Sequence, residues 1–85
     1  MTRTVRIRFF ASAREAVGRA SLTWDVPERG IAARALVQEI VTRYPALAAI
    51  ARHSRLVHNG EYVRTPLEPV RPGDEFGIHP PYSGG

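Results

Sequence analysis

The sequence predicts a two-layer α+β fold, in which a mixed sheet of four to five strands packs on one main helix and a short helix joins strands one and two. Two observations predict this class. Segments with the period-two alternation of half-buried strands stand near both ends of the 85-residue chain, and one segment between them has the spacing of an amphipathic helix. A single amphipathic helix must bury its apolar stripe against a sheet, which gives the two layers.

The first strand and the short helix are predicted near the N-terminus. Residues 3–10 alternate, and one face carries three apolar side chains: Val5, Ile7 and Phe9. Residues 11–17 follow as a short helix, with Ser12 as its N-cap and Gly18 as its end. A second strand, which we expect to pair with the first, ends at Pro27 and alternates at three positions: Leu22, Trp24 and Val26.

The main helix is predicted after the turn at residues 28–30. Its apolar residues recur every three or four positions and form one stripe: Leu36, Val37, Ile40, Val41 and Tyr44. Pro45 ends the helix, because its ring clashes with the preceding turn. A short further turn of helix is predicted through Leu47 and Ile50.

The last third of the chain returns to strands. Asn59-Gly60 predicts a hairpin between residues 56–58 and 61–63, since this pair favours the tight turn that a hairpin needs. Pro66 and Pro69 predict a loop, and a turn at residues 72–74 leads into a last strand at 75–79. With the first and last strands at the centre of the sheet, this order is that of the β-grasp, or ubiquitin-like, fold.

Composition and length narrow the function. We expect one domain at residues 1–79 and an extended, flexible tail at 80–85, with little room for a deep catalytic cleft. The absence of cysteine excludes disulfides and cysteine nucleophiles, and the three histidines lack a metal-ligand spacing, so we expect no metal and no bound cofactor. No apolar stretch is long enough to form the core of a signal peptide or to cross a membrane. We therefore expect a cytoplasmic protein without membrane contact.

The tail carries the predicted chemistry. Fully extended, residues 80–85 reach about 20 Å. Pro80 and Pro81 stiffen its base, because proline favours an extended polyproline conformation. Gly84 and Gly85 have no side chains that would obstruct a narrow channel. We therefore expect a partner enzyme to take the terminal carboxylate into a buried site.

The sequence resembles the small subunit of molybdopterin synthase, a family of ubiquitin-like sulfur carriers. The resemblance spans nearly the whole chain and is carried by six segments: 8–11 (Arg-Phe-Phe-Ala), 13–18 (Ala-Arg-Glu-Ala-Val-Gly), 43–47 (Arg-Tyr-Pro-Ala-Leu), 59–63 (Asn-Gly-Glu-Tyr-Val), 72–75 (Pro-Gly-Asp-Glu) and 80–85 (Pro-Pro-Tyr-Ser-Gly-Gly).

This resemblance implies a sulfur-donor subunit that is not itself catalytic. An E1-like adenylating enzyme would use ATP to activate the Gly85 carboxylate, next to Gly84. A sulfur donor, either a sulfurtransferase or a cysteine desulfurase, would then leave a thiocarboxylate. The tail would enter the large synthase subunit, within a heterotetramer, and its sulfur would attack the cyclic pyranopterin precursor of the molybdenum cofactor.

The resemblance also implies that partners dock on the outer sheet face as well as on the tail. The residues predicted to bind partners come from both: Phe10, Tyr62, His79, Pro80, Pro81, Tyr82 and Ser83. An aromatic side chain exposed beside arginines is typical of such a surface. The alternative for Phe10 is that it packs beneath the short helix.

Three other functions stay open. One is a sulfur carrier for thiazole or cysteine synthesis, although thiazole carriers typically lack the helix at 11–17. Another is a ubiquitin-like protein modifier that joins Gly85 to lysines. A nucleic-acid-binding module is suggested by the net charge of +4, but the aromatic RNA-binding motif is absent and the element order is wrong, so we expect no nucleic acid.

Overall fold

The computed structural model describes residues 3–81. The main elements along the chain are β1 (Thr4–Phe9), α1 (Ala11–Val17), β2 (Ser21–Asp25), β3 (Ile31–Ala32), α2 (Ala33–Arg43), the 3₁₀ turn η1 (Pro45–Leu47), α3 (Ala48–Arg52), β4 (Arg55–His58), β5 (Glu61–Tyr62), β6 (Pro69–Val70) and β7 (Glu75–His79).

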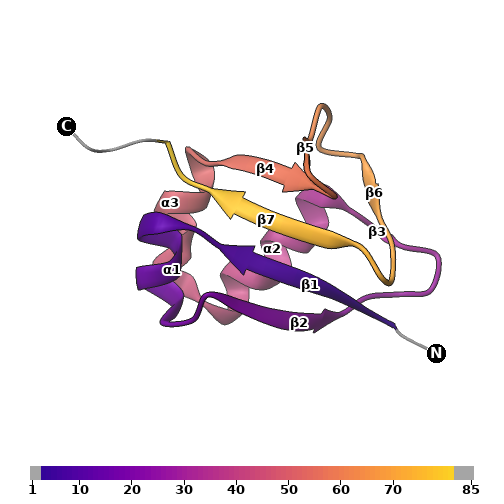
Figure 1. Ribbon diagram of the computed structural model, residues 1–85, viewed down its shortest axis with the longest axis horizontal. Coiled ribbons are helices and arrows are strands. Elements are labelled where there is room, and N and C mark those ends of the chain that lie inside the picture. Colours follow the sequence, from indigo (N-terminus) through magenta and orange to yellow (C-terminus); the bar gives the residue numbers. More distant parts are fainter. Residues whose placement is uncertain (1–2, 82–85) are drawn as a thin grey trace.

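Five strands form one mixed sheet in the order β2-β1-β7-β4-β5 (Figure 1). β1 and β7 pair in parallel at its centre, with Ile7 opposite Phe76, and the other neighbours pair antiparallel. The predicted β-grasp arrangement is confirmed, including the short helix between the first two strands. Because β1 and β7 are parallel, the sheet receives the chain at one end and releases it at the other.

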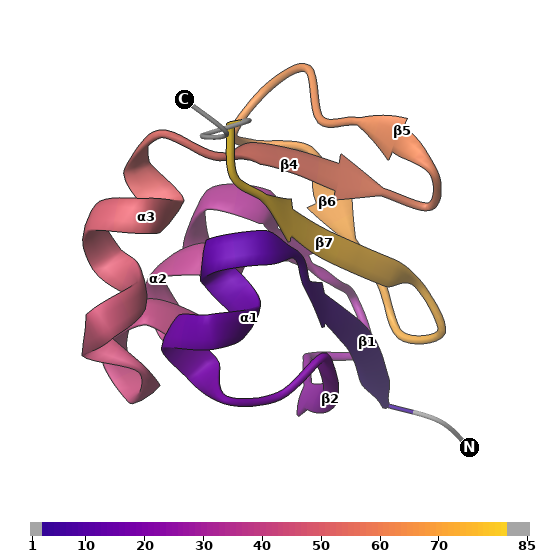
Figure 2. The same cartoon turned by 60° about the vertical axis from the view of Figure 1, so that its left-hand side comes forward.

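The helices α1, α2 and α3 cover one face of the sheet, and within residues 3–81 no helix covers the other face (Figure 2). The apolar stripes predicted for β1 and α2 meet in this layer, where Ile7, Leu36 and Phe76 are fully buried. Trp24 packs at the rim of this core, and its indole N–H donates a 2.9 Å hydrogen bond to Glu39 Oε1. Burial of these side chains supplies the main driving force for folding, because no disulfide is possible.

The start of α1 differs from the prediction. Ser12 is not the N-cap; Phe10 occupies that position, and no side chain caps the helix. The chain turns sharply here, since Ala11 has a positive φ of 50°. The predicted end is confirmed, because Gly18 is left-handed and its N–H donates to Arg14 O at 2.8 Å.

A small second sheet, β3 with β6, was not expected. Pro69 predicted a loop, yet it lies opposite Ala32 in a two-residue antiparallel pair, beside Ile31 and Val70. A proline is compatible with so short an edge strand, because its missing N–H need not face the partner. This pair ties the loop after β5 to the start of α2.

Both predicted tight turns are confirmed. Asn59 and Gly60 have positive φ angles of 50° and 86°, as the hairpin turn requires, and Gly73 has a φ of 92° in the turn before β7. Among residues 3–81, no helix has the length and apolar character needed to cross a membrane.

Candidate functional site

The candidate site is the outer face of the five-stranded sheet, opposite the helices. The strand register places alternate side chains on it: Arg6 and Arg8 from β1, Glu75, Gly77 and His79 from β7, and Arg55 and Val57 from β4. The antiparallel partner β2 adds Asp25, opposite Thr4, so three guanidinium groups and two carboxylates share this face. The closest opposite pair, Arg8 Nη1 and Glu75 Oε1, is 4.0 Å apart.

Phe10 lies on this outer face. Its ring centroid is 5.2 Å from that of His79, and the guanidinium carbon of Arg8 also lies 5.2 Å from the Phe10 ring centroid. The backbone fixes the residue, because its N–H donates to Ile78 O at 3.3 Å and its carbonyl accepts from Ala13 N at 3.0 Å. The alternative, in which Phe10 packs beneath α1, is therefore wrong. Its docking role stays a prediction.

Gly77 makes room for the Phe10 ring. A Cβ atom at Gly77 would lie 3.1 Å from Phe10 Cε2, so the ring rests on the bare backbone of β7. A shallow hollow of about 190 Å³ opens beside it, bordered also by Val57 and Asn59. No role for Gly77 was predicted from the sequence. A glycine inside a strand pattern often marks such a close approach, and this was the available signal.

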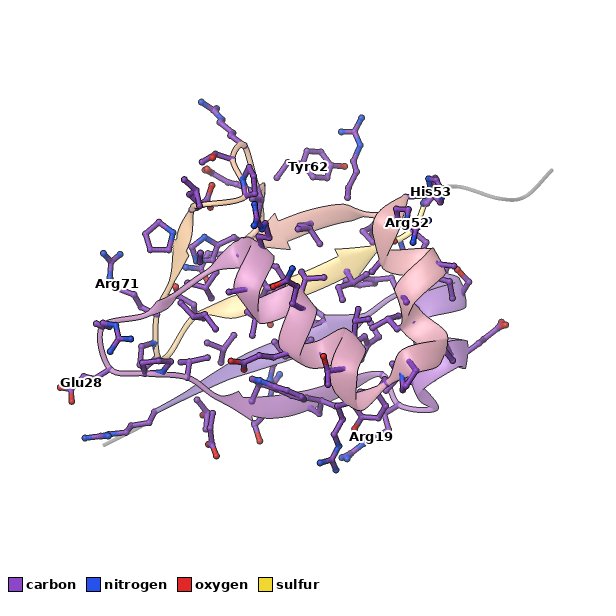
Figure 3. All side chains as sticks on the ribbon, turned by 180° about the vertical axis from the view of Figure 1, so that it is seen from behind. Arg19, Glu28, Arg52, His53, Tyr62 and Arg71 are labelled. Carbon is purple, nitrogen blue, oxygen red and sulfur yellow. The ribbon has the colours of Figure 1, made fainter. Side chains whose placement is uncertain are left out.

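Tyr62 is brought to the same face but stands apart from Phe10. Tyr62 belongs to β5, at the sheet edge beyond β4, where it pairs with Val57 of β4 (Figure 3). Its side chain is 56% exposed. Its ring centroid is 4.8 Å from the guanidinium carbon of Arg55. Three strand spacings separate β5 from β1, which is about 14 Å. The face thus presents two arginine–aromatic pairs, each able to bury apolar area and attract an acidic group.

The base of the tail is partly built into the body. Pro80, predicted to begin the tail, is buried, whereas Pro81 is exposed. Both border an apolar hollow of about 260 Å³ with residues from α1 and α3: Ser12, Ala49, Ile50 and His53. Figure 3 shows His53 at the end of α3, where the chain leaves the sheet. The predicted site residues Tyr82, Ser83, Gly84 and Gly85 lie outside the described residues, so the division at 79/80 stays a prediction.

Substitution of Gly77 tests whether the Phe10 ring lies directly against the backbone of β7. In Gly77→Ala the new methyl would push the half-exposed Phe10 ring outward by a few tenths of an ångström. We expect the free energy of unfolding to change by less than about 1 kcal/mol, because alanine also favours the strand backbone over glycine. The NMR shifts of the His79 ring protons should move. Phe10→Ala is the control that removes the ring, and unchanged His79 shifts in Gly77→Ala would contradict this geometry.

The comparisons with known proteins agree with this fold and reach the end of the chain. The ThiS family model matches residues 7–85. The molybdopterin synthase sulfur carrier subunit of Homo sapiens is 39% identical, over 95% of this chain and 93% of its own.

Two solved structures are similar, each 26% identical. SAMP1 from Haloferax volcanii has a TM-score of 0.84 and covers 96% of this chain and 99% of its own. The putative molybdopterin converting factor subunit 1 from Pyrococcus furiosus has a TM-score of 0.80, with 93% and 98% covered. The resemblance read from the sequence is thereby confirmed, and the chain belongs to the ThiS family.

Proposed function

We propose that this protein is the sulfur-carrier small subunit of a molybdopterin synthase and donates sulfur in molybdenum cofactor biosynthesis. One observation carries the proposal. The family match extends through Gly85, so it includes the tail whose carboxyl group would carry the sulfur, and the relatives matched over nearly the full length bear this function in their names.

The chemistry takes place at the Gly85 carboxylate. An E1-like adenylating enzyme joins the carboxylate to the AMP moiety of ATP and releases pyrophosphate, which leaves a mixed anhydride. The terminal sulfur of a persulfide on the donor attacks the acyl carbon and AMP departs. A thiol then reduces the resulting acyl disulfide, which releases the thiocarboxylate and leaves a disulfide. The thiocarboxylate sulfur then attacks the cyclic pyranopterin precursor, and hydrolysis of the acyl link restores the carboxylate.

The body of the protein positions this reactive end for its partners. The partners are the adenylating enzyme, the sulfur donor and the large synthase subunit, with which the carrier forms a heterotetramer in the cytoplasm. The Arg8–Phe10 and Arg55–Tyr62 pairs supply a docking face for them. Because this face is rich in guanidinium groups, we expect an acidic counterpart on the partner, and binding that weakens as salt concentration rises.

A second candidate function is covalent modification of other proteins. It is favoured by the similarity to SAMP1, a small archaeal modifier protein by name. This function begins with the same adenylation and ends with Gly85 in an isopeptide bond. A sulfur carrier for thiazole or cysteine synthesis would differ only in its acceptor. The helix α1, at Ala11–Val17, favours the pterin pathway over the thiazole pathway.

Intact mass measurement separates these functions. After incubation with a cognate adenylating enzyme, ATP and a sulfur donor, we expect one oxygen of the protein to be replaced by one sulfur. Addition of the large subunit and the pterin precursor should return the original mass. A covalent conjugate with a second protein would support the modifier. Sulfur that moves only to a thiazole system would overturn the pterin assignment.

A further inference from the structure

His58 forms a cluster on the helix side of the sheet that the proposed function does not use. It ends β4, and its side chain is 13% exposed. Nδ1 lies 2.7 Å from Glu68 Oε2, and Nε2 lies 2.7 Å from Asp74 Oδ2. A neutral imidazole has one N–H, so it can donate to only one of two carboxylates. With both carboxylates ionised, two such short contacts are satisfied together when the ring is doubly protonated and donates to both.

The cluster joins three parts of the chain that are far apart in sequence. His58 belongs to the sheet, Glu68 to the loop after β5, and Asp74 to the turn before β7. Both carboxylates are held independently of the ring. Asp74 Oδ2 accepts the Arg71 N–H at 2.8 Å, and Glu68 Oε1 accepts the Arg64 N–H at 3.3 Å.

Two other acidic residues are neighbours of the His58 cluster but are not hydrogen-bond partners of its ring. Glu61 lies opposite His58 in the β4–β5 pair, and Glu75 follows Asp74. The Glu75 N–H donates to Asn59 Oδ1 at 2.8 Å. The Glu75 carboxylate belongs to the outer face, near Arg8. The charges that contact the ring among the described residues are therefore both negative, and they favour the imidazolium.

The segment from Glu61 to Val70 is held by backbone pairing at its two ends, β5 with β4 and β6 with β3, and has few buried side chains between them. Most of its side chains are exposed, Leu67 by 70%, and residues 62–66 border a hollow of about 350 Å³ together with residues 54–56. Backbone bonds do tie it elsewhere: Val63 N–H to Leu56 O at 2.8 Å, Ala33 N–H to Glu68 O at 2.8 Å, and Arg34 N–H to Pro66 O at 2.9 Å. The His58–Glu68 contact is its one ion pair with the sheet among residues 3–81, beside the Arg55–Tyr62 cation–π contact.

We propose that protonated His58 clamps the 61–70 segment to the sheet, and that loss of its proton releases this segment, which carries Tyr62 of the candidate docking face. Only one carboxylate can keep its hydrogen bond to a neutral ring. The other is then left facing a nitrogen lone pair, so the contact becomes repulsive. The clamp is a pH-sensitive element that lies at the end of β7 remote from the tail.

The direction of the pH dependence follows from the electrostatics. Burial of His58 works against its charged form, but the hydrogen bonds to Asp74 and Glu68 outweigh burial and raise its pKa above 6.5. A raised folded-state pKa means stability that is complete below about pH 6.5 and is lost as pH rises through the folded pKa. The hydrogen bond from His58 lowers the pKa of Glu68. Burial of Asp74 is outweighed by hydrogen bonds from Arg71 and His58, so its pKa is lowered too. Their contribution is lost only in acid.

Amide hydrogen exchange and an NMR titration of the unmodified protein test the clamp. We expect the His58 ring to titrate above 6.5 with both nitrogens protonated below that point. As pH rises from about 6.5 to the folded pKa, the opening constant of amides in the 61–70 segment should grow by up to about tenfold per pH unit. Amides of α2 should keep their protection. Titration at or below 6.5, or an equal loss of protection in α2, would overturn the proposal.

Two glutamine variants provide the matched comparison. In His58→Gln the opening constant of the segment should be higher at about pH 6 and no longer depend on pH up to about pH 9, because an uncharged amide cannot titrate. His53→Gln removes another histidine, exposed and outside the cluster, and should follow the unmodified protein. Glu68→Gln should lower the pKa of His58 in the same titration. If His58→Gln keeps the original pH dependence, the clamp does not exist.

Discussion

Deletion of Gly85, or extension of the chain beyond it, is expected to reduce sulfur transfer to the level seen without the carrier, while the free energy of unfolding changes by less than about 0.5 kcal/mol. The reacting group is the terminal carboxylate of Gly85. Deletion moves the free carboxylate one residue closer to the body, and extension converts the Gly85 carboxyl group to an amide, so neither variant presents a free carboxylate at the position that the partner enzymes receive. The fold should persist, because the core is made by residues up to Ile78 and the body ends at the buried Pro80. Thiocarboxylate formation by intact mass and thermal unfolding are the two measurements.

An extension of equal length at the N-terminus is the matched control. β1 begins at the end of the sheet opposite to that where β7 ends, so an N-terminal extension is joined to the body at the end away from the tail base (Figure 1). This control should keep full activity. If the C-terminally extended chain transferred sulfur as well as the control does, the carboxyl-centred mechanism would be refuted.

Replacement of Phe10 by arginine should weaken binding to the large subunit or to the adenylating enzyme by about thirtyfold, with little loss of stability. An aromatic anchor at an interface typically contributes about 2 kcal/mol or more to binding, and the new guanidinium would also stand beside Arg8. The ring is half-buried on the sheet face and contacts Arg8, Gly77 and His79 rather than the core. Titration calorimetry measures the affinity, and chemical denaturation measures the stability.

Leu67→Arg is the matched control for this variant. Leu67 is a large apolar side chain that is 70% exposed. It lies in the loop between β5 and β6 rather than in the sheet. The Leu67→Arg variant should bind the partner with unchanged affinity. A loss of several kcal/mol of stability in Phe10→Arg would instead place the ring in the core and remove it from the docking face.

Most of the fold could be predicted because most of its elements have a local sequence pattern that is typical of a strand, a helix or a turn. The alternation of β1 and the stripe on α2 follow from side-chain geometry alone. The three predicted residues of β1 are buried, whereas the stripe is buried at Leu36 and Ile40 and only partly buried at its other positions. Asn59-Gly60 and Gly73 specify backbone angles that few other residues adopt without strain. The outer-face position of Phe10 followed from the same alternation, carried one residue past the end of β1.

What the sequence did not reveal depends on contacts between distant segments. Ser12 has the chemistry of a cap, but the sharp turn at Ala11 gives that position to Phe10. The β3–β6 pair has two residues per strand, which is too short for a periodic signal. Glu68 and Asp74 stand ten and sixteen residues after His58, and only the folded loops bring three such side chains together.

The central place of β7 has a consequence for synthesis. β1 and β4 both need β7 as their neighbour, yet it is the last strand of the domain to leave the ribosome. A nascent chain that stops before residue 75 has two unpaired strand edges and lacks Phe76 and Ile78, so it cannot close its core and is open to proteolysis. A copy that has folded has therefore been synthesised at least through β7, which lies just before its reactive end.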